Sequence, residues 1–336
     1  MVYSSSSATL TAVERKQGGV ASGRWCGPVA TFIVLFGAAW LALYIASLLL
    51  PFTRPGSVVI ADAKFDRLVT SKMFGPQDRY RAMIFGHSKV LAGVRPRELD
   101  AAVGPGFRSY NLGLPGEVHF LPILEAALQA GNVPTHVMLT LAWDAKPTKD
   151  GFMDALRNDA AIATSVLPFR TLPRDAALFL FQNRHRLTEA VRDVAAQREA
   201  MLDDGGWYFI KSQSHYENDA LPDDYALPTD HSSRVDVRTI PERSYTRERL
   251  EQLARQYGFQ VLLIPVPFRT GEFAPAPATD GRLVTISEDP LIRVVGPDYF
   301  SYPPAFFADP SHMNPRGALA YTDDLARLLK ASRVFD

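Results

Sequence analysis

Residues 81–88 read RAMIFGHS, an apolar run followed by a glycine-containing turn. The short run over 81–85 predicts a buried β-strand. The turn ends in Ser88 and leads into a helical stretch over 94–102. In open α/β sheets, sites form beyond the carboxyl ends of the strands. Ser88 is therefore predicted to present its hydroxyl at that edge, where backbone N–H groups face a developing oxyanion.

The alternation of strands and helices continues along the chain. Further strands are predicted at 107–111, 136–143, 260–267 and 291–295, and helices at 121–130, 246–257 and 318–329. Strands that alternate with helices favour an α/β fold with a doubly wound parallel sheet.

Residues 145–245 interrupt this alternation. They include a predicted helix at 186–202 and then a polar stretch with several prolines. Two interpretations stay open, a surface insertion of loops and a substrate-facing lid or groove. The sequence GGWY at 205–208 is either an aromatic platform for a sugar or a buried aromatic pair.

Residues 28–52 read PVATFIVLFGAAWLALYIASLLLPF and carry no charged side chain. As a helix they reach roughly 37 Å, enough to cross a hydrocarbon core of about 30 Å. A buried core helix rarely lacks a polar face over this length. The small-x-small triplet at 61–63 lies far from the run, and the run is longer than a signal peptide requires. We therefore predict an uncleaved transmembrane helix over 28–52.

The charges that flank this helix predict its orientation. Two arginines and a lysine precede it against one glutamate, whereas the charges that follow it nearly cancel. The positive-inside rule then makes residues 1–27 a disordered cytoplasmic tail and places 53–336 outside the cytoplasm. The expected protein is a single-pass protein of a bacterial inner membrane with a periplasmic domain.

Composition excludes several classes of protein. Lysines and arginines equal aspartates and glutamates at 36 each, so no basic face for nucleic acid is indicated. Cys26 is the single cysteine, which excludes an internal disulfide and a site with several thiolates. The seven histidines show no zinc-ligand spacing. We expect no metal, no cofactor and no nucleic-acid partner.

A second polar motif, DPSHMNPRG, lies at 309–317. The D-x-x-H spacing puts Asp309 and His312 on one tight turn, where the carboxylate can orient the imidazole and stabilise its cation. A serine hydroxyl is a weak nucleophile until such a base takes its proton. Either motif alone is common in turns, and it is their order along the chain, first strand to last helix, that links this pair to Ser88.

Three blocks of the chain together resemble a known family: FGHS at 85–88, YNLGLPG at 110–116 and DPSHMNPRG at 309–317. They look like the SGNH (GDSL-type) hydrolases, and most like the membrane-anchored branch with the alginate O-acetylation proteins and the D-alanine transfer protein DltD. The resemblance covers about 80–145 and 255–332. It implies an SGNH/flavodoxin-like, three-layer fold with a parallel sheet.

The resemblance also implies roles for individual residues. Ser88 would be the nucleophile, with Asp309 and His312 completing the triad. Gly113 would donate its N–H to the oxyanion. Asn111 and Asp144 are the further residues expected to line the oxyanion or substrate site.

Two departures from the family pattern stand out. The usual G-D-S reads GHS here, which retains the nucleophile. The third block, G-x-N-D, has no clear counterpart, because the chain reads LAWDA at 141–145. Asp144 would oppose an oxyanion unless it is protonated or turned away. His119 either faces the cleft or begins a helix.

Three functions follow as expectations. The first is an O-acyltransferase, in particular an acetyltransferase, that acts on an exported polysaccharide beside an MBOAT-type membrane acyltransferase. The second is a periplasmic carbohydrate esterase, in which water resolves the same acyl-enzyme. The third is a non-catalytic accessory protein of a polysaccharide acylation or export complex.

Overall fold

The computed structural model describes residues 26–50, 56–115, 120–140, 169, 172–209, 214, 216–230, 245–272, 283–285 and 291–335. The chain divides into two compact units, Met1–Leu50 and Pro51–Asp336. The predicted tail over 1–27 lies almost wholly outside the described residues.

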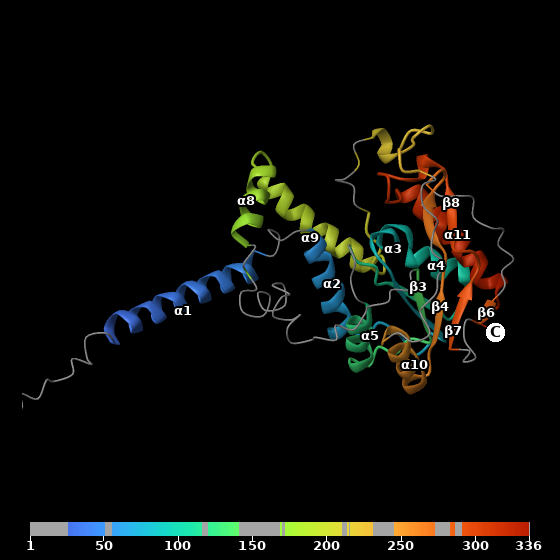
Figure 1. The fold of residues 1–336 in the computed structure, drawn as a ribbon, viewed down its shortest axis with the longest axis horizontal. Coiled ribbons are helices and arrows are strands. Elements are labelled where there is room, and N and C mark those ends of the chain that lie inside the picture. The colour runs from blue at the N-terminus through green and yellow to red at the C-terminus, as the bar shows by residue number, and fades with distance from the viewer. Residues whose placement is uncertain are drawn as a thin grey trace, which may run out of the picture. The chain divides into compact units, whose positions relative to one another are not determined.

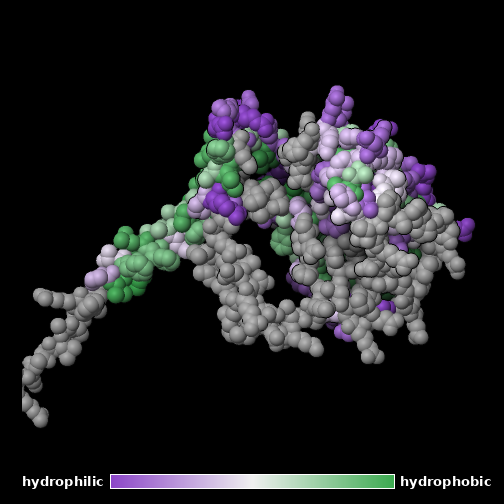
Figure 2. Space-filling model, turned by 45° about the horizontal axis from the view of Figure 1, so that its top comes forward, coloured by the Kyte–Doolittle hydropathy of each residue, from purple (hydrophilic) through white to green (hydrophobic). Residues whose placement is uncertain are grey.

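The described part of the first unit is one helix, α1 (Cys26–Leu49). Its apolar segment Gly27–Ser47 is long and apolar enough to cross a membrane, and its large apolar side chains are exposed, Phe32 by 69% and Phe36 by 58%. Hydrophobic residues cover most of its surface in Figure 2. The prediction of a membrane-spanning helix is confirmed to this extent, although the helix begins and ends earlier than 28–52.

The second unit is built on a six-stranded sheet in the order β2-β1-β3-β4-β7-β6. Neighbouring strands are parallel from β2 to β7, and β6 alone is antiparallel among the described strands. The strands are β1 (Tyr80–Phe85), β2 (Phe107–Asn111), β3 (His136–Leu139), β4 (Gln260–Leu263), β6 (Leu283–Thr285) and β7 (Ile292–Val295). The predicted doubly wound α/β sheet is confirmed. Its chain order reverses between β1 and β3, the point where ligands bind in such sheets.

Helices cover both faces of this sheet, which gives three layers (Figure 1). Met83 and Phe85 of β1 face one cluster of buried apolar residues, and Ala82 and Ile84 face the other, because alternate strand residues point to opposite faces. The first face carries α2 (Gly56–Thr70), α5 (Phe120–Gln129) and α10 (Tyr245–Tyr257). The second carries α3 (Ser88–Gly93), α4 (Pro96–Val103) and α11 (Pro315–Ala331).

Prolines explain where the observed elements differ from the predicted ones. The strand predicted at 260–267 leaves the main sheet at Pro265, which has no N–H to donate. The chain continues as β5 (Val266–Arg269), which pairs with β8 (Tyr299–Tyr302) in a separate two-stranded sheet. The helix predicted at 94–102 begins two residues later, as α4, because Val94 and Arg95 are extended and the residue before Pro96 is disfavoured in helical conformation.

The region 145–245 contains more regular structure than the sequence indicated. The helix predicted at 186–202 is confirmed as α9 (Leu187–Asp203), and α8 (Leu172–Gln182) precedes it. Two short 3₁₀ helices are η3 (Glu217–Asp219), within this region, and η4 (Pro304–Phe306), before α11.

The GGWY segment after α9 packs against the sheet domain. The Trp207 indole donates to the carbonyl of Ala92, and the Arg95 guanidinium lies 4.6 Å from the centre of its ring. The Gly205 carbonyl accepts from the N–H of Asn111. Trp207 and Tyr208 are half-buried, and Arg95 covers one face of the indole. The geometry is that of a packing contact more than of an open sugar platform.

Candidate functional site

Asp309 and His312 form a hydrogen-bonded pair. Asp309 Oδ2 lies 2.7 Å from His312 Nδ1, while Oδ1 accepts the N–H groups of Ser311 and His312 at 2.8 and 2.9 Å. Burial alone would raise the pKa of Asp309, but the bonds from the His312 ring and from these N–H groups hold it below its ordinary value. The carboxylate is thus ionised and fixes the ring, which leaves Nε2 as the nitrogen directed elsewhere.

Ser88 begins α3 directly after the carboxyl end of β1. His87 Nδ1 accepts the Lys89 N–H at 3.1 Å and so caps this helix. With the cap supplied by His87, Ser88 is not needed for that role. Within the described residues the Ser88 hydroxyl has no hydrogen-bond partner, and the side chain is half-buried.

The residues on either side of Ser88 share an electrostatic environment with the Asp309–His312 pair. Burial, then the charges of Lys89 and His312, lower the pKa of His87 to about 4. Burial also lowers the pKa of Lys89 to about 8, against the attraction of Glu272 and Asp309. The helix that carries Ser88 packs on α11, which directly follows the pair. Ser88 and His312 lie in one region but are not hydrogen-bonded to each other in this structure.

Lys89 belongs to this region, and sequence reasoning did not single it out. Its ammonium lies 3.2 Å from Glu272 Oε1 and 3.7 Å from the centre of the Phe268 ring. Glu272 is 183 positions away in the chain, so no local pattern could have revealed the pair. The adjacency of Lys89 to Ser88 was the one available signal.

Part of the 145–245 region borders the site. Arg269, at the end of β5, is fully buried and makes two bonds with the Asp230 carboxylate, at 2.7 and 3.0 Å. Asn314, which caps α11, donates to the carbonyl of Asp219 at 3.0 Å. The first contact ties residue 230 to the end of β5, and the second places residue 219 beside the Asp309–Asn314 loop.

The second block is a structural loop in this structure. The Asn111 amide is fully buried and donates to the carbonyls of Val90 and Val94 at 2.8 Å each. Its Oδ1 accepts the N–H of Gly113 at 2.9 Å. The Gly113 N–H is therefore engaged and does not face an oxyanion, contrary to the role predicted for it. Asn111 likewise directs its side chain to α3 and not to a substrate.

A buried lysine holds the same loop from the other side. Lys64 of α2 donates to the carbonyls of Asn111 and Gly113 at 2.8 and 2.7 Å. Complete burial lowers the pKa of Lys64 well below its ordinary value. A side chain of Cβ size at Gly113 would meet the Leu91 nitrogen at 2.6 Å, so only glycine fits here.

Two predicted site residues, Asp144 and His119, lie outside the described residues. The same is true of the chain where a third block would follow β3. Among the residues that the structure describes, no group of three potential ligands could hold a metal ion.

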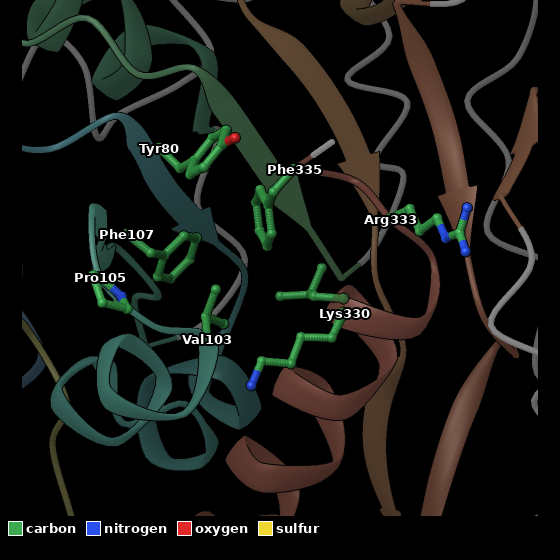
Figure 3. Close-up of a pocket in the computed structure, with 8 residues that line it drawn as sticks. Tyr80, Val103, Pro105, Phe107, Lys330, Arg333 and Phe335 are labelled. Carbon is green, nitrogen blue, oxygen red and sulfur yellow. The ribbon is translucent and has the colours of Figure 1, made fainter.

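A cavity of about 200 Å³ opens at the opposite edge of the sheet (Figure 3). Tyr80 and Phe107, the first residues of β1 and β2, line it together with Phe335 near the carboxyl terminus. Because Ser88 follows the carboxyl end of β1, this cavity is separate from the candidate site.

No protein-family model, no curated protein and no solved structure matches this chain. The resemblance of the three sequence blocks to the SGNH hydrolases therefore rests on their residues alone.

Proposed function

We propose that the Pro51–Asp336 unit is an SGNH-type O-acyltransferase that moves an acyl group, in particular acetyl, onto an exported polysaccharide. The observation that carries this proposal is the Asp309–His312 bond of 2.7 Å, directly before α11, the helix on which the Ser88-bearing α3 packs. Nucleophilic acyl transfer needs a carboxylate that orients an imidazole and a serine hydroxyl that this imidazole can reach. The structure provides the oriented imidazole, and among the described residues the Ser88 hydroxyl has no hydrogen-bond partner.

The proposed reaction has two balanced halves. Ser88 Oγ attacks the acyl carbon of the donor while His312 Nε2 takes the serine proton and then returns it to the leaving group. A sugar hydroxyl next gives its proton to His312 and attacks the acyl-serine. The bond from the acyl carbon to Ser88 Oγ breaks, the imidazolium returns its proton to Oγ, and the acylated sugar leaves. Throughout, Asp309 holds the ring through Nδ1 and stabilises the imidazolium.

The membrane part of the proposal rests on α1. We infer that this helix anchors the protein as a single-pass protein of a bacterial inner membrane, with the enzyme domain in the periplasm. An anchored enzyme works beside an immobile donor, and a multi-spanning acyltransferase of the MBOAT type would bring the acyl group across the membrane.

A second candidate is a non-catalytic accessory protein of the same polysaccharide complex. The engaged N–H of Gly113 favours it, because an acyl-transfer site needs donors for the oxyanion. Periplasmic esterase activity shares the triad and differs in using water to resolve the acyl-serine.

The deciding experiment is Ser88→Ala in cells that make the acylated polymer. The proposal expects acylation to be lost while protein amount and membrane location stay unchanged. Ser311→Ala, a serine of the neighbouring loop, is the matched control and should retain acylation. Normal acylation by Ser88→Ala would establish the accessory role instead. Brisk hydrolysis of p-nitrophenyl acetate by the purified chain would favour the esterase.

The orientation has its own test. Alkaline phosphatase fused after Asp336 should be active, and green fluorescent protein at the same place should be dark. The opposite pattern would put the enzyme domain in the cytoplasm.

A further inference from the structure

The α8–α9 pair carries apolar side chains on its surface. Leu178 and Leu180 of α8 are 50% exposed each, and Phe181 is 68% exposed. Leu178 and Phe181 are three positions apart and so share one side of the helix. At the start of α9, Leu187 is 40% exposed. Grouped exposure of large apolar side chains marks a surface that contacts another phase or protein.

Arginines border this apolar surface. The Arg184 guanidinium lies 5.0 Å from the centre of the Phe181 ring, in the NRHR turn that joins the two helices. Arg174 pairs with the buried Asp175 at 3.0 Å, and Arg186 lies 4.0 Å from the exposed Asp193, yet the two arginine side chains stay 68% and 63% exposed. Hydrophobic and strongly hydrophilic residues lie next to each other at this place in Figure 2. An exposed apolar group rimmed by arginines is typical of helices that lie in a membrane interface.

The other end of α9 is fixed to the sheet domain. Met201 is buried in a cluster with Ile60 and Ala63 of α2, and Arg198 pairs with Asp66 of α2 at 3.7 Å. From this attachment α9 runs away from the sheet toward α8 (Figure 1). The apolar surface therefore lies at the end of α9 that is distant from α2, and α9 contacts the sheet domain through α2.

The sequence connects α2 closely to the apolar helix. α1 ends at Leu49, and α2 begins at Gly56. In a protein anchored by α1, the six residues between the two helices reach at most about 25 Å, so the start of α2 is within reach of the bilayer. A lipid surface is therefore the partner that both the charge of the turn and the chain connectivity favour.

We propose that the membrane-facing surface, defined as Leu178, Phe181, Arg184, Arg186 and Leu187, rests on the anionic surface of the bilayer that α1 enters. The apolar side chains enter the region between headgroups and acyl chains, and the arginines bind lipid phosphates. This second contact fixes the orientation of the domain over the membrane. The inference rests on the proposed anchor and is independent of the chemistry at Ser88.

Spin labels in the full chain test this contact. Cys26 is the single cysteine, so Cys26→Ala gives a background for single labels. Labels are placed through Phe181→Cys, through Val34→Cys in α1, and through Leu319→Cys as a control on α11, where the leucine is 43% exposed. One chain is reconstituted per nanodisc of phosphatidylcholine with about a quarter phosphatidylglycerol. Relaxation by oxygen reports lipid, and relaxation by a water-soluble nickel chelate reports solvent.

We expect oxygen to relax the labels at positions 34 and 181 more strongly than the nickel chelate does, and the nickel chelate to relax the label at position 319 more strongly. Replacing Arg184 and Arg186 by glutamate, or omitting phosphatidylglycerol, should shift position 181 toward nickel. If 181 behaves like 319 while 34 stays in lipid, the membrane-facing surface is refuted and the anchor stands. If 34 also favours nickel, the anchor itself fails. Shielding of 181 from both reagents would mean that protein covers the surface, and equal results without anionic lipid would refute the role of the arginines.

Discussion

The Asp309–His312 loop and the Asn111–Gly113 loop were both predicted at one site, yet they use their polar groups differently. In the first, a carboxylate bonds to one nitrogen of an imidazole and leaves the other nitrogen for chemistry. In the second, the Asn111 amide and the Gly113 N–H all bond within the protein.

This difference separates residues with a polar group available for chemistry from residues whose polar groups only stabilise the fold. A polar group whose hydrogen bonds are all made inside the protein stabilises one conformation and has nothing left for a substrate. A group with an unengaged atom beside an oriented partner can transfer a proton. On this criterion Ser88 and His312 are candidates for chemistry, whereas Asn111 and Lys64 stabilise the loop at 111–113 and its contact with α3.

The largest expected effect is on activity, at Asp309. Asp309→Asn keeps an oxygen for the neighbouring N–H groups but no longer stabilises the imidazolium or fixes its tautomer. Acylation should fall roughly 10⁴-fold, as for such changes in established triads. Asp324→Asn is the matched control, since this aspartate of α11 bonds to the Tyr302 hydroxyl instead. The measurement is the acyl content of the polymer at equal protein amounts, and a loss below about tenfold would exclude a triad.

The second effect is on stability, at Asn111. Asn111→Ala leaves the Val94 carbonyl and the Gly113 N–H without partners in a fully buried place. At about 1–3 kcal/mol for each of these two groups, the free energy of unfolding should fall by about 2–6 kcal/mol. Asn183→Ala, which removes a single bond to Phe179 at the α8–α9 turn, should lower it by less than about 1.5 kcal/mol. Equal losses of unfolding free energy for the two variants, measured with urea, would show that the buried hydrogen bonds of Asn111 do not stabilise the fold more than one exposed bond does.

How much the sequence could predict depends on the range of the contact. The Asp309–His312 bond spans three positions, so spacing alone predicted it. Four of the five parallel strands were predicted from local apolar runs, and the strand at 107–111 was predicted from the glycines that follow it. The bond from Lys64 to Asn111 spans 47 positions, and no periodicity reports it. The family pattern assigned the Gly113 N–H to the oxyanion from its position in the motif. The partner of that N–H depends on where the Asn111 side chain lies, and tertiary packing decides this.

A third prediction concerns pH and uses His136, which lies in β3 away from the site. Burial, and to a smaller degree the charge of Arg293, lower its pKa to about 4 against the opposing bond to the Val334 carbonyl. The unfolded chain therefore binds the proton more tightly than the folded chain. The stabilising contribution is complete above about pH 6.5 and is lost as the pH falls toward 4.

The size of this loss is at most about 3 kcal/mol, from 1.36 kcal/mol per unit of pKa. His136→Gln should reduce the difference in unfolding free energy between pH 7 and pH 4.5 by up to this amount. His185→Gln is the control, since His185 lies exposed in the α8–α9 turn. An unchanged pH dependence in His136→Gln would show that the buried ring does not titrate in this window.

The smallest expected effect is on stability at Ser88, and it compares the proposed nucleophile directly with a serine that stabilises the fold. Ser88→Ala removes a hydroxyl that has no partner among the described residues, at a helix start already capped by His87. The free energy of unfolding should change by less than about 0.5 kcal/mol. Ser109→Ala is the same chemical change at a buried serine whose hydroxyl donates to Asp100 Oδ1 at 2.7 Å, and it should lower stability by about 1–2 kcal/mol. If Ser88→Ala destabilises the chain as much as Ser109→Ala does, the Ser88 hydroxyl makes a hydrogen bond that stabilises the fold. It would then not be available as a nucleophile, and any loss of acylation in that variant would have to be attributed to unfolding.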